Sequence, residues 1–203
     1  DPERTASILS DATDAVLEGA LTVATGLVIA QRDGVEAVSA GPDAGGCWQA
    51  ARARHAIIAM GRLGGREIGY ASDADVLFVH QVRDGAGEEA AAQEAEAVAK
   101  QVMGLLAAAL PHPLEVDCGL RPEGRNGVMS RSLDAYREYY GRWSALWERQ
   151  ALLRARPCSG DRELGRRFEE LVNPLRWAQK GLAPQDLREI RRIKARVEAE
   201  RLP

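Results

Sequence analysis

The sequence predicts an α+β domain in which helices flank a small mixed sheet. Two long stretches, residues 5–30 and 88–110, repeat apolar side chains at the three- and four-residue spacing of helices. Short apolar runs at 56–60 and 76–79 have the length of buried strands, and residues 114–120 alternate apolar with acidic side chains as a half-buried strand does. Long helices around a few short strands are typical of the α+β class.

Composition and charge limit the class of protein. Of the 203 residues, 45% are apolar, which is sufficient for a packed core, and the formal net charge of −3 gives no reason to expect nucleic acid as a partner. Three cysteines at wide spacing fit reduced thiols in the cytoplasm. The apolar stretch 20–30 is shorter than the roughly 20 residues of a membrane span, so neither a span nor a signal peptide is expected.

The elements of the N-terminal half have clear local signals. The helix over 5–30 is expected to pack on the sheet, and residues 33–46, rich in Gly, Asp, Ser and Pro, are expected to form a loop. A strand over 56–60 is followed by a glycine turn and a short helix that lead into the first acidic strand. The helix over 88–110 ends at a proline and is expected to cross over between the two acidic strands.

The C-terminal part is expected to be helical. Ser132 and Asp161 are suitable N-caps for helices over 133–140 and 162–171, because their side chains can accept hydrogen bonds from the first free backbone N–H groups. Further helices are predicted over 143–155 and 185–200. The chain thus divides into three expected parts: an N-terminal helix and loop (1–54), a sheet core (55–131) and a helical region (132–203).

Two local patterns carry more specific expectations. Asn126-Gly127 is a strong hairpin signal, so residues 128–130 are expected to pair back onto the strand that carries Asp117. Trp143 and Trp147 lie four residues apart on one helix face, and we expect them to pack in the core rather than stack on a base.

Three aspartates form the candidate functional group. Asp73 and Asp75 are two residues apart, and such residues of a strand point to the same face, so both can hold one magnesium ion. Alternatively, they cap a buried strand. If the strand with Asp117 lies alongside, three acids converge, which is the arrangement that holds two metal ions for phosphoryl transfer from a nucleoside triphosphate. Glu115 shares that face, and its role stays open between the metal site and an ion pair.

A glycine pair precedes these acids. Gly64 and Gly65 lack a Cβ and would let the backbone approach a phosphate, although an ordinary tight turn needs the same residues. Ser72 can either bond a phosphate or cap the turn. Three arginines can either bind triphosphate oxygens in a bidentate manner or neutralise nearby glutamates: Arg121, Arg154 and Arg156.

Three ordered motifs resemble the glutamate-ammonia ligase adenylyltransferases, the family of enzymes that modify glutamine synthetase. They are MGRLGGREIGYASDAD at 60–75, EVDCGLRPEG at 115–124 and WERQALLRAR at 147–156. One position departs from the family, since many members carry arginine where this chain has Gly119. A cation facing the acids is therefore either absent or supplied by Arg121 or Arg154.

The resemblance implies a polymerase-β-like nucleotidyltransferase fold and one catalytic half of a two-half enzyme. Gln150 and the helix over 187–196 resemble the adenylylating half more closely. The implied reaction transfers AMP from ATP to a tyrosine hydroxyl of glutamine synthetase and so regulates nitrogen assimilation. The implied residues are Asp73, Asp75 and Asp117 for catalysis and for two Mg²⁺ or Mn²⁺ ions, and Gly64, Gly65, Ser72, Arg121 and Arg154 for the nucleotide.

The same resemblance defines the expected partners and the alternatives. Glutamine synthetase, ATP and, through the full-length enzyme, the PII signal protein are the expected partners, in the cytoplasm, without nucleic acid or membrane. The nearest alternative is the half that removes AMP by phosphorolysis. A nucleotidyltransferase-like module that binds nucleotide or a partner without turnover, and adenylylation of a small molecule, are the others.

Overall fold

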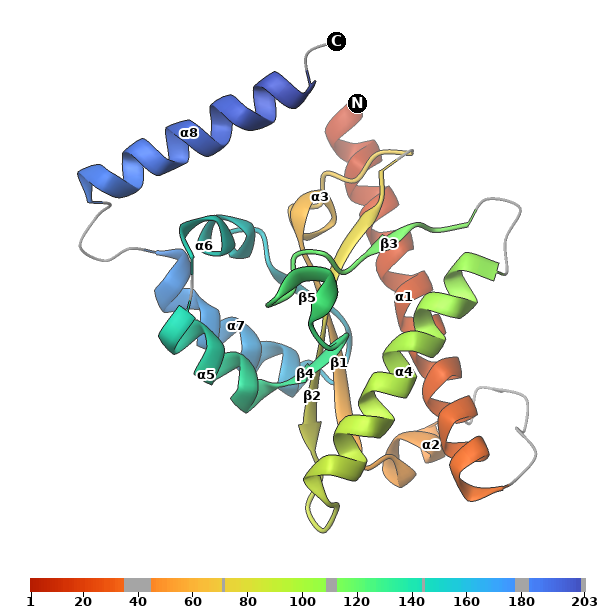
Figure 1. The fold of residues 1–203 in the computed structure, drawn as a ribbon. Coiled ribbons are helices and arrows are strands. Elements are labelled where there is room, and N and C mark those ends of the chain that lie inside the picture. Colours follow the sequence, from red (N-terminus) through yellow and green to blue (C-terminus); the bar gives the residue numbers. More distant parts are fainter. Residues whose placement is uncertain (35–44, 71, 109–112, 144, 178–182, 202–203) are drawn as a thin grey trace.

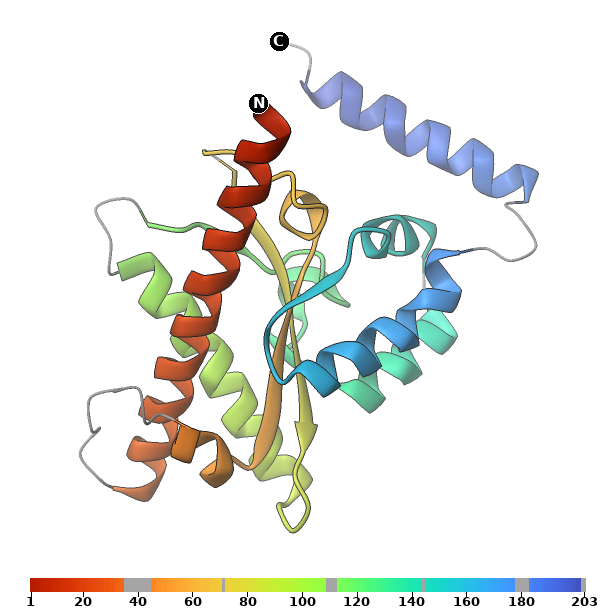
Figure 2. The ribbon, with the colours of Figure 1, turned by 180° about the vertical axis from the view of Figure 1, so that it is seen from behind.

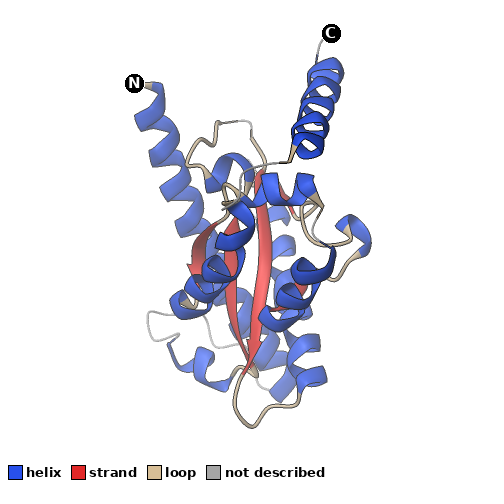
Figure 3. Ribbon diagram, turned by 90° about the vertical axis from the view of Figure 1, so that its left-hand side faces the viewer, coloured by secondary structure: helices blue, strands red, loops and turns tan. Residues whose placement is uncertain are grey.

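A computed structural model shows a mixed sheet between two layers of helices, which confirms the α+β class (Figure 1). In the view of Figure 3 the strands lie between helices on both sides. The parts of the chain that the structure describes are residues 1–34, 45–70, 72–108, 113–143, 145–177 and 183–201, with no side chains described at 45–47, 197, 200 and 201.

The sheet has five strands, in the order β3-β2-β1-β5, with β4 also on β2. β1 (Ala53–Ala59) pairs antiparallel with both β2 (Ala74–Val82) and β5 (Arg156–Gly160). β3 (Val116–Asp117) and β4 (Ser130–Ser132) pair parallel with β2. The expected mixed sheet is therefore present, and β2 is its central strand.

β3 and β4 follow one another along β2. Ala74 and Asp75 pair with β3, whereas Phe78 to His80 pair with β4. Because β1 occupies one edge of β2 from Val76 onward, β4 must use the other edge. Residues 118–129 leave the sheet between these two pairings and return to it, with the short 3₁₀ helix η1 (Gly124–Asn126) inside the excursion.

One face of the sheet is covered by α1 (Pro2–Asp33) and α4 (Glu88–Ala108), which lie side by side (Figure 2). α2 (Gly45–Ala50) packs at the end of α1. The apolar side chains of α1 and α4 meet alternate residues of β1 and β2, because neighbouring strand residues point to opposite faces. This core includes Leu17, Leu21, Ile57, Val76, Phe78, Val98 and Val102.

The other face is covered by α5 (Leu133–Trp143), α6 (Leu146–Leu152) and α7 (Arg162–Arg176). The second core includes Ile58, Leu77, Val79, Tyr136, Leu152, Phe168 and Val172. Ser132 Oγ accepts from Ala135 N at 3.1 Å and Asp161 Oδ1 accepts from Leu164 N at 2.8 Å, so both predicted N-caps are confirmed.

Two short or peripheral helices complete the chain. α3 (Gly61–Gly64) follows β1 directly and leads toward β2. α8 (Pro184–Arg201) extends away from the rest of the chain, and its main packing partner is α6 (Figure 1). The helix predicted over 185–200 is confirmed by α8. Most of the described side chains of α8 are exposed.

α1 is the one helix among the described residues with the length and apolar composition of a membrane span, with a mean hydropathy of 1.4 in its most apolar window. No span is expected when the stretch 20–30 is considered alone and not as part of the whole helix predicted over 5–30. Length and composition fit a core helix equally well, and Leu17, Leu21 and Ala24 are at most 1% exposed against the sheet and α4. Because 28% of the residues in that window are buried, α1 packs one face into the core and leaves its other faces outside it.

Four sequence-based predictions were wrong or incomplete. Residues 128–130 do not form a hairpin with the Asp117 strand, because the backbone turns through η1 and then pairs with β2 instead. The helix predicted over 143–155 is shorter, and β5 at 156–160 was not predicted at all. Trp143 and Trp147 lie on different helices and are 71% and 42% exposed, so neither is a core residue.

The loop predicted over 33–46 falls largely outside the described residues, but α1 continues to Asp33 and α2 begins at Gly45.

Candidate active site

The three aspartates meet where β2 begins. β3 lies parallel to β2 with Asp117 directly beside Asp75, and Ala74 N donates to Glu115 O at 2.8 Å to start this pairing. Asp73 is the residue before the strand. One carboxylate oxygen from each of Asp73, Asp75 and Asp117 lies within 4.8 Å of the others, so the structure brings the three predicted acids together.

The surroundings of Asp75 disfavour its charged form. Burial, and then the negative charges of Asp73 and Asp117, raise the pKa of Asp75 to about 6. The nearby Arg62 guanidinium acts in the opposite direction. Three crowded acids with one exposed and two half-buried members fit a hard divalent cation, which neutralises such a cluster and prefers carboxylate oxygens.

Backbone contacts fix Asp117. Its Oδ1 accepts a hydrogen bond from Gly119 N at 2.6 Å. A Cβ at Gly119 would lie 3.0 Å from that same oxygen, which is a tight contact. The small size of Gly119 therefore lets the backbone support Asp117 closely.

Gly61 makes room for Asp75. Its φ of 51° lies in the left-handed region that favours glycine, and a Cβ there would overlap Asp75 Oδ2. Met60 N donates to Asp75 O at 2.8 Å, so the chain entering α3 is attached to the strand that carries the acid. The spacing of the sequence did not indicate this contact between Gly61 and Asp75.

The predicted glycine pair packs against protein backbone. Gly64 is buried, and a Cβ there would overlap the carbonyl oxygen of Arg154. Gly65 is half-buried beneath the Arg154 side chain, which a Cβ would approach to 3.3 Å. Gly64 is therefore needed because the backbone at Arg154 approaches it closely. Gly65 lies nearer the surface.

Ser72 and Arg62 are linked beside the acids. Ser72 Oγ accepts from Gly69 N at 3.3 Å, which caps the turn, and from Arg62 Nη1 at 3.2 Å. Arg62 is exposed on α3 and is the cation whose charge reaches Asp75. Sequence reasoning missed Arg62, although it lies inside the 60–75 motif, one residue after Gly61.

The three arginines proposed from the sequence have different surroundings. Arg121 is buried and donates to the carbonyl oxygens of Cys118, Arg125 and Gly127, so it braces the 118–129 excursion. Arg154 Nη1 donates to Glu67 at 2.7 Å, and both side chains are about half exposed. Arg156 pairs with Asp14 of α1 at 2.7 Å and also bonds the carbonyl oxygens of Leu63 and Gly64.

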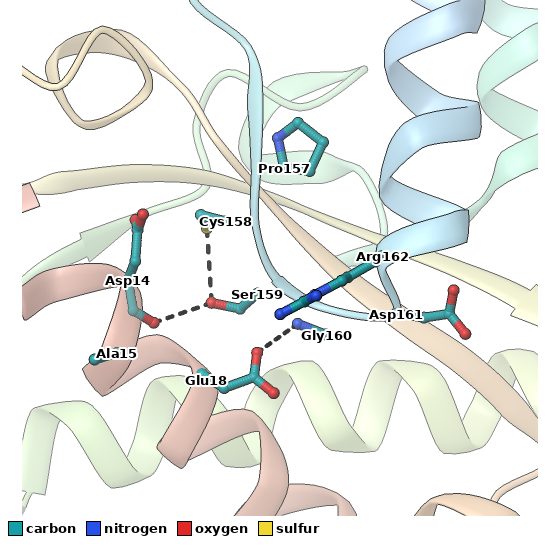
Figure 4. A pocket seen from close by; sticks show the side chains of 9 residues that line it. All are labelled: Asp14, Ala15, Glu18, Pro157, Cys158, Ser159, Gly160, Asp161 and Arg162. Atoms are coloured by element: carbon teal, nitrogen blue, oxygen red, sulfur yellow. Dashed lines mark hydrogen bonds between the residues drawn. The ribbon is translucent and has the colours of Figure 1, made fainter. Parts of the chain in front are cut away.

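Other candidates lie apart from the acids. Glu115 is exposed and is not part of the close carboxylate group in the described residues. A cavity of about 440 Å³ between α1 and β5 (Figure 4) and another of about 510 Å³ beside Tyr139 and Trp143 are not lined by any of the three aspartates. The acids themselves therefore locate the candidate centre.

Fold and site together define an α+β domain with a three-carboxylate centre of the kind that binds divalent cations. Comparison with known proteins then identifies the family. The chain belongs to the glutamate-ammonia ligase adenylyltransferase family, whose sequence pattern matches residues 3–171.

The curated relatives share one name, bifunctional glutamine synthetase adenylyltransferase/adenylyl-removing enzyme. The chain is 55% identical to that of Streptomyces coelicolor over 151 residues and 54% identical to that of Streptomyces avermitilis over 151 residues, in both cases 74% of this chain and 15% of the relative. It is 52% identical to that of Mycobacterium avium over 163 residues, 80% of this chain and 16% of the relative. The matched part of this chain thus spans only about 15% of the length of these relatives.

Proposed function

We propose that this chain transfers AMP from ATP to a tyrosine hydroxyl of glutamine synthetase, on a polymerase-β-like nucleotidyltransferase fold. The observation that carries the proposal is the convergence of Asp73, Asp75 and Asp117 at the start of β2. The family membership and the names of the relatives support the adenylyl chemistry and the protein substrate.

Asp73, Asp75 and Asp117 would hold Mg²⁺ or Mn²⁺. The raised pKa of Asp75 and the 4.8 Å spacing of the carboxylate oxygens fit a cation between them. When bound, such ions neutralise the charge of the triphosphate and of the developing transition state.

Asp117 is the residue we assign to the incoming hydroxyl. The hydrogen bond from Gly119 N orients Oδ1, and the carboxylate would activate the hydroxyl either as a base or through a bound metal ion. General-base assistance of this kind contributes about 10²–10⁴-fold to a rate.

The cationic side chains near the acids would bind the nucleotide. Arg62 lies on α3 and Arg154 lies against Gly65 at its end; both are exposed, and guanidinium groups bind phosphate oxygens through paired hydrogen bonds. Ser72 lies within hydrogen-bond distance of Arg62 and can join it, and Gly65 leaves the backbone accessible beside Arg154. A phosphate role for Arg121 would require it to release three carbonyl oxygens, so we favour Arg62 in its place.

Removal of AMP by phosphorolysis is the second candidate. The names of the relatives contain both activities, and the same three acids would serve either reaction. We assign the adenylylating direction because of the motif resemblance around Gln150 and along α8. We further propose that the protein works in the cytoplasm, with ATP and glutamine synthetase as partners, and that PII acts on the full-length enzyme.

The test is a transfer assay with α-labelled ATP, Mg²⁺ and purified glutamine synthetase, beside a phosphorolysis assay with adenylylated synthetase and phosphate. Label should appear on the synthetase in the first assay. Asp75→Asn should remove the transfer while the fold is retained, because it removes one of the charges that would hold the cation. Asp134→Asn, at an exposed ion pair on α5, is the matched control and should keep the parent rate.

The outcomes separate the alternatives. A folded Asp75→Asn protein with the parent transfer rate would refute the assignment of the acids. Formation of ADP from adenylylated synthetase, without transfer in the first assay, would identify the removing half. Binding of Mg-ATP without either reaction would identify a non-catalytic module.

A further inference from the structure

The C-terminal end of α3 is held by an arginine from a distant segment of the chain. Arg156, the first residue of β5, donates from Nη2 to the carbonyl oxygen of Leu63 at 3.2 Å and from Nε to that of Gly64 at 3.4 Å. A basic side chain suits this place, because the last carbonyl groups of a helix lack intrahelical donors. α3 is a single turn, so its orientation depends on such outside contacts.

An aspartate of α1 orients this arginine. Asp14 accepts hydrogen bonds from both terminal nitrogens of Arg156, from Nη1 at 2.7 Å and from Nη2 at 3.1 Å. The side chains of Arg156 and Asp14 are 24% and 17% exposed, so the pair is largely shielded from water. Because a paired contact of this kind fixes the plane of the guanidinium, α1, β5 and α3 are joined through one side chain.

A second ion pair joins α1 to the end of α3. Asp11 lies three residues before Asp14, on the same face of α1, and pairs with Arg66, which comes just after α3. Arg66 Nη2 also lies 3.4 Å from Ser7 Oγ, on the preceding turn of α1. In Figure 2 the first half of α1 passes beside this part of the chain. The segment that follows β1 is therefore attached to α1 at two points.

The opposite end of α3 reaches the three aspartates. Met60 N donates to Asp75 O at 2.8 Å, which attaches the start of α3 to β2. Arg62, within α3, donates from Nη1 to Ser72 Oγ at 3.2 Å, and Ser72 directly precedes Asp73 in the chain. A rotation of α3 about its attachment to β2 would therefore move the Arg62 guanidinium relative to the acids.

Other contacts keep α1, β5 and α3 in place without this arginine. Leu63 is fully buried in the core between the sheet and α1. Ser159 Oγ donates to Asp14 O at 3.2 Å. Gly160 N donates to Glu18 Oε2 at 2.6 Å, and Figure 4 draws both of these bonds between β5 and α1. The fold should therefore survive a change of the arginine, so the orientation of α3 can be tested separately from folding.

We propose that Asp14 and Arg156 are positioning residues, which hold the end of α3 so that Arg62 faces a nucleoside triphosphate at the aspartates. All three guanidinium nitrogens of Arg156 are engaged by oxygens of the protein, so this arginine supports the site rather than binding phosphate. The inference rests on the proposed function, because that function assigns the triphosphate to Arg62. Nucleotide binding then depends on a contact from α1, a helix that carries none of the three aspartates.

The test is calorimetric titration of the whole chain with Mg-ATP. Arg156→Lys keeps a charge beside Asp14, but one ammonium group cannot span the carboxylate and both carbonyl oxygens. The dissociation constant should rise about tenfold, as expected when groups that support a binding site are disturbed. Asp14→Asn should raise it by a smaller factor, because the carbonyl contacts remain. Arg54→Lys, the same change at the ion pair with Asp161, is the matched control and should bind as the parent does.

Two further measurements separate positioning from stability. Amide hydrogen exchange at Gly64 and Gly65, whose N–H groups form the hydrogen bonds of α3, should become faster in Arg156→Lys. In the transfer assay, KM for ATP should rise by the same factor as the dissociation constant and kcat should change less, because Arg62 binds the same phosphate oxygens before and during the reaction. A purely structural ion pair would lower the free energy of unfolding and leave these quantities unchanged.

The outcomes distinguish this inference from the proposed function. Transfer by the parent, with unchanged Mg-ATP affinity in folded Arg156→Lys, would overturn the positioning role alone. Weaker binding in the variant, without transfer by the parent, would overturn the transferase assignment alone. Weaker binding with unchanged exchange at α3 would mean that Arg156 contacts the nucleotide, which also contradicts positioning. A parent that does not bind Mg-ATP would overturn both. Asp14→Asn carries the same test if Arg156→Lys does not fold.

Discussion

Single glycines determine where two of the three clustered carboxylates can lie. Gly61 leaves the space that Asp75 Oδ2 occupies, and Gly119 supplies the N–H that holds Asp117. Neither residue carries a functional group, yet each supports one acid directly. Substitutions at these positions should therefore change the site more than the stability of the fold.

Gly61→Ala should weaken the binding of Mn²⁺. The added Cβ would overlap Asp75 Oδ2. The alanine would also have to adopt the positive φ of Gly61, which costs about 1–2 kcal/mol for a residue other than glycine. We expect at least about a tenfold loss of affinity, the usual effect of disturbing groups that support metal ligands. Calorimetric titration with Mn²⁺ measures it.

The control is Gly104→Ala in α4, where a Cβ would have nothing within 4 Å. It should keep the Mn²⁺ affinity and raise the free energy of unfolding by about 0.5–1 kcal/mol, since alanine is the better helix former. Parent affinity for Mn²⁺ in the Gly61→Ala protein would show that Asp75 does not hold the ion.

At the scale of elements, Glu94 connects α4 to α1 and to the start of β1. Its Oε2 accepts from Arg32 Nη1 at 2.7 Å and its Oε1 accepts from Arg52 N at 2.6 Å. The side chain is 3% exposed, so the carboxylate is compensated by these two donors rather than by water.

Glu94→Ala should lower the free energy of unfolding by about 2–3 kcal/mol, because it leaves Arg52 N without its acceptor and removes the buried ion-pair partner of Arg32, which keeps Ala50 O and Asp33. Glu94→Gln keeps the shape and one acceptor and should cost about half as much. Urea denaturation measures both. Glu89 is an exposed residue of the same helix that accepts a hydrogen bond from Gln93, and Glu89→Ala should stay within about 0.5 kcal/mol of the parent. Equal losses at both positions would contradict this account.

The sequence predicted best the elements that depend on local patterns, such as the spacing of apolar side chains along a helix. The helices at α1, α4, α5 and α7, and both N-caps, followed from spacing and capping chemistry. β5 was missed because Arg156, Pro157 and Ser159 carry no strand pattern, and this segment becomes a strand only through pairing with β1. The hairpin was wrong for a similar reason, since the edge of β2 competed successfully for residues 130–132.

The site was predictable in part. The two-residue spacing of Asp73 and Asp75 suggested one shared face, and the neighbouring strand brings in Asp117. Arg62 could not be inferred from spacing, because its approach to Asp75 depends on the path of α3 after Gly61. Likewise, only the three-dimensional packing shows that Gly64 contacts the backbone at Arg154 and that Arg121 braces a loop.

At the scale of the whole molecule, a pair of buried histidines links stability to pH. His55 and His80 are directly paired across β1 and β2, and burial is the main cause that lowers their pKa values to about 3 and about 4. In the unfolded chain both would titrate near 6.5. Their contribution to stability is therefore complete above about pH 6.5 and is lost as the pH falls, because the unfolded state then binds more protons.

The free energy of unfolding should decrease below about pH 6 by up to about 1.4 kcal/mol per pH unit for each histidine. Asp75, whose pKa is raised, acts in the opposite direction over the same range and reduces the net slope. Urea denaturation between about pH 4.5 and 6.5 measures the slope. His80→Gln should make the slope clearly shallower, and a slope that does not change would refute the role of this pair.

The excursion over residues 118–129 has a consequence for how the protein can diversify. The chain pairs with β2 both before this segment, through β3, and after it, through β4. Within the segment, Arg121 donates hydrogen bonds to three backbone carbonyl oxygens. Sequence changes in this segment can therefore reshape the rim next to Asp117 without shifting the strand register on which both hydrophobic layers depend. The exposed residues of this segment can therefore vary with little effect on the pairing of β2, whereas Cys118 and Arg121, which are buried, cannot.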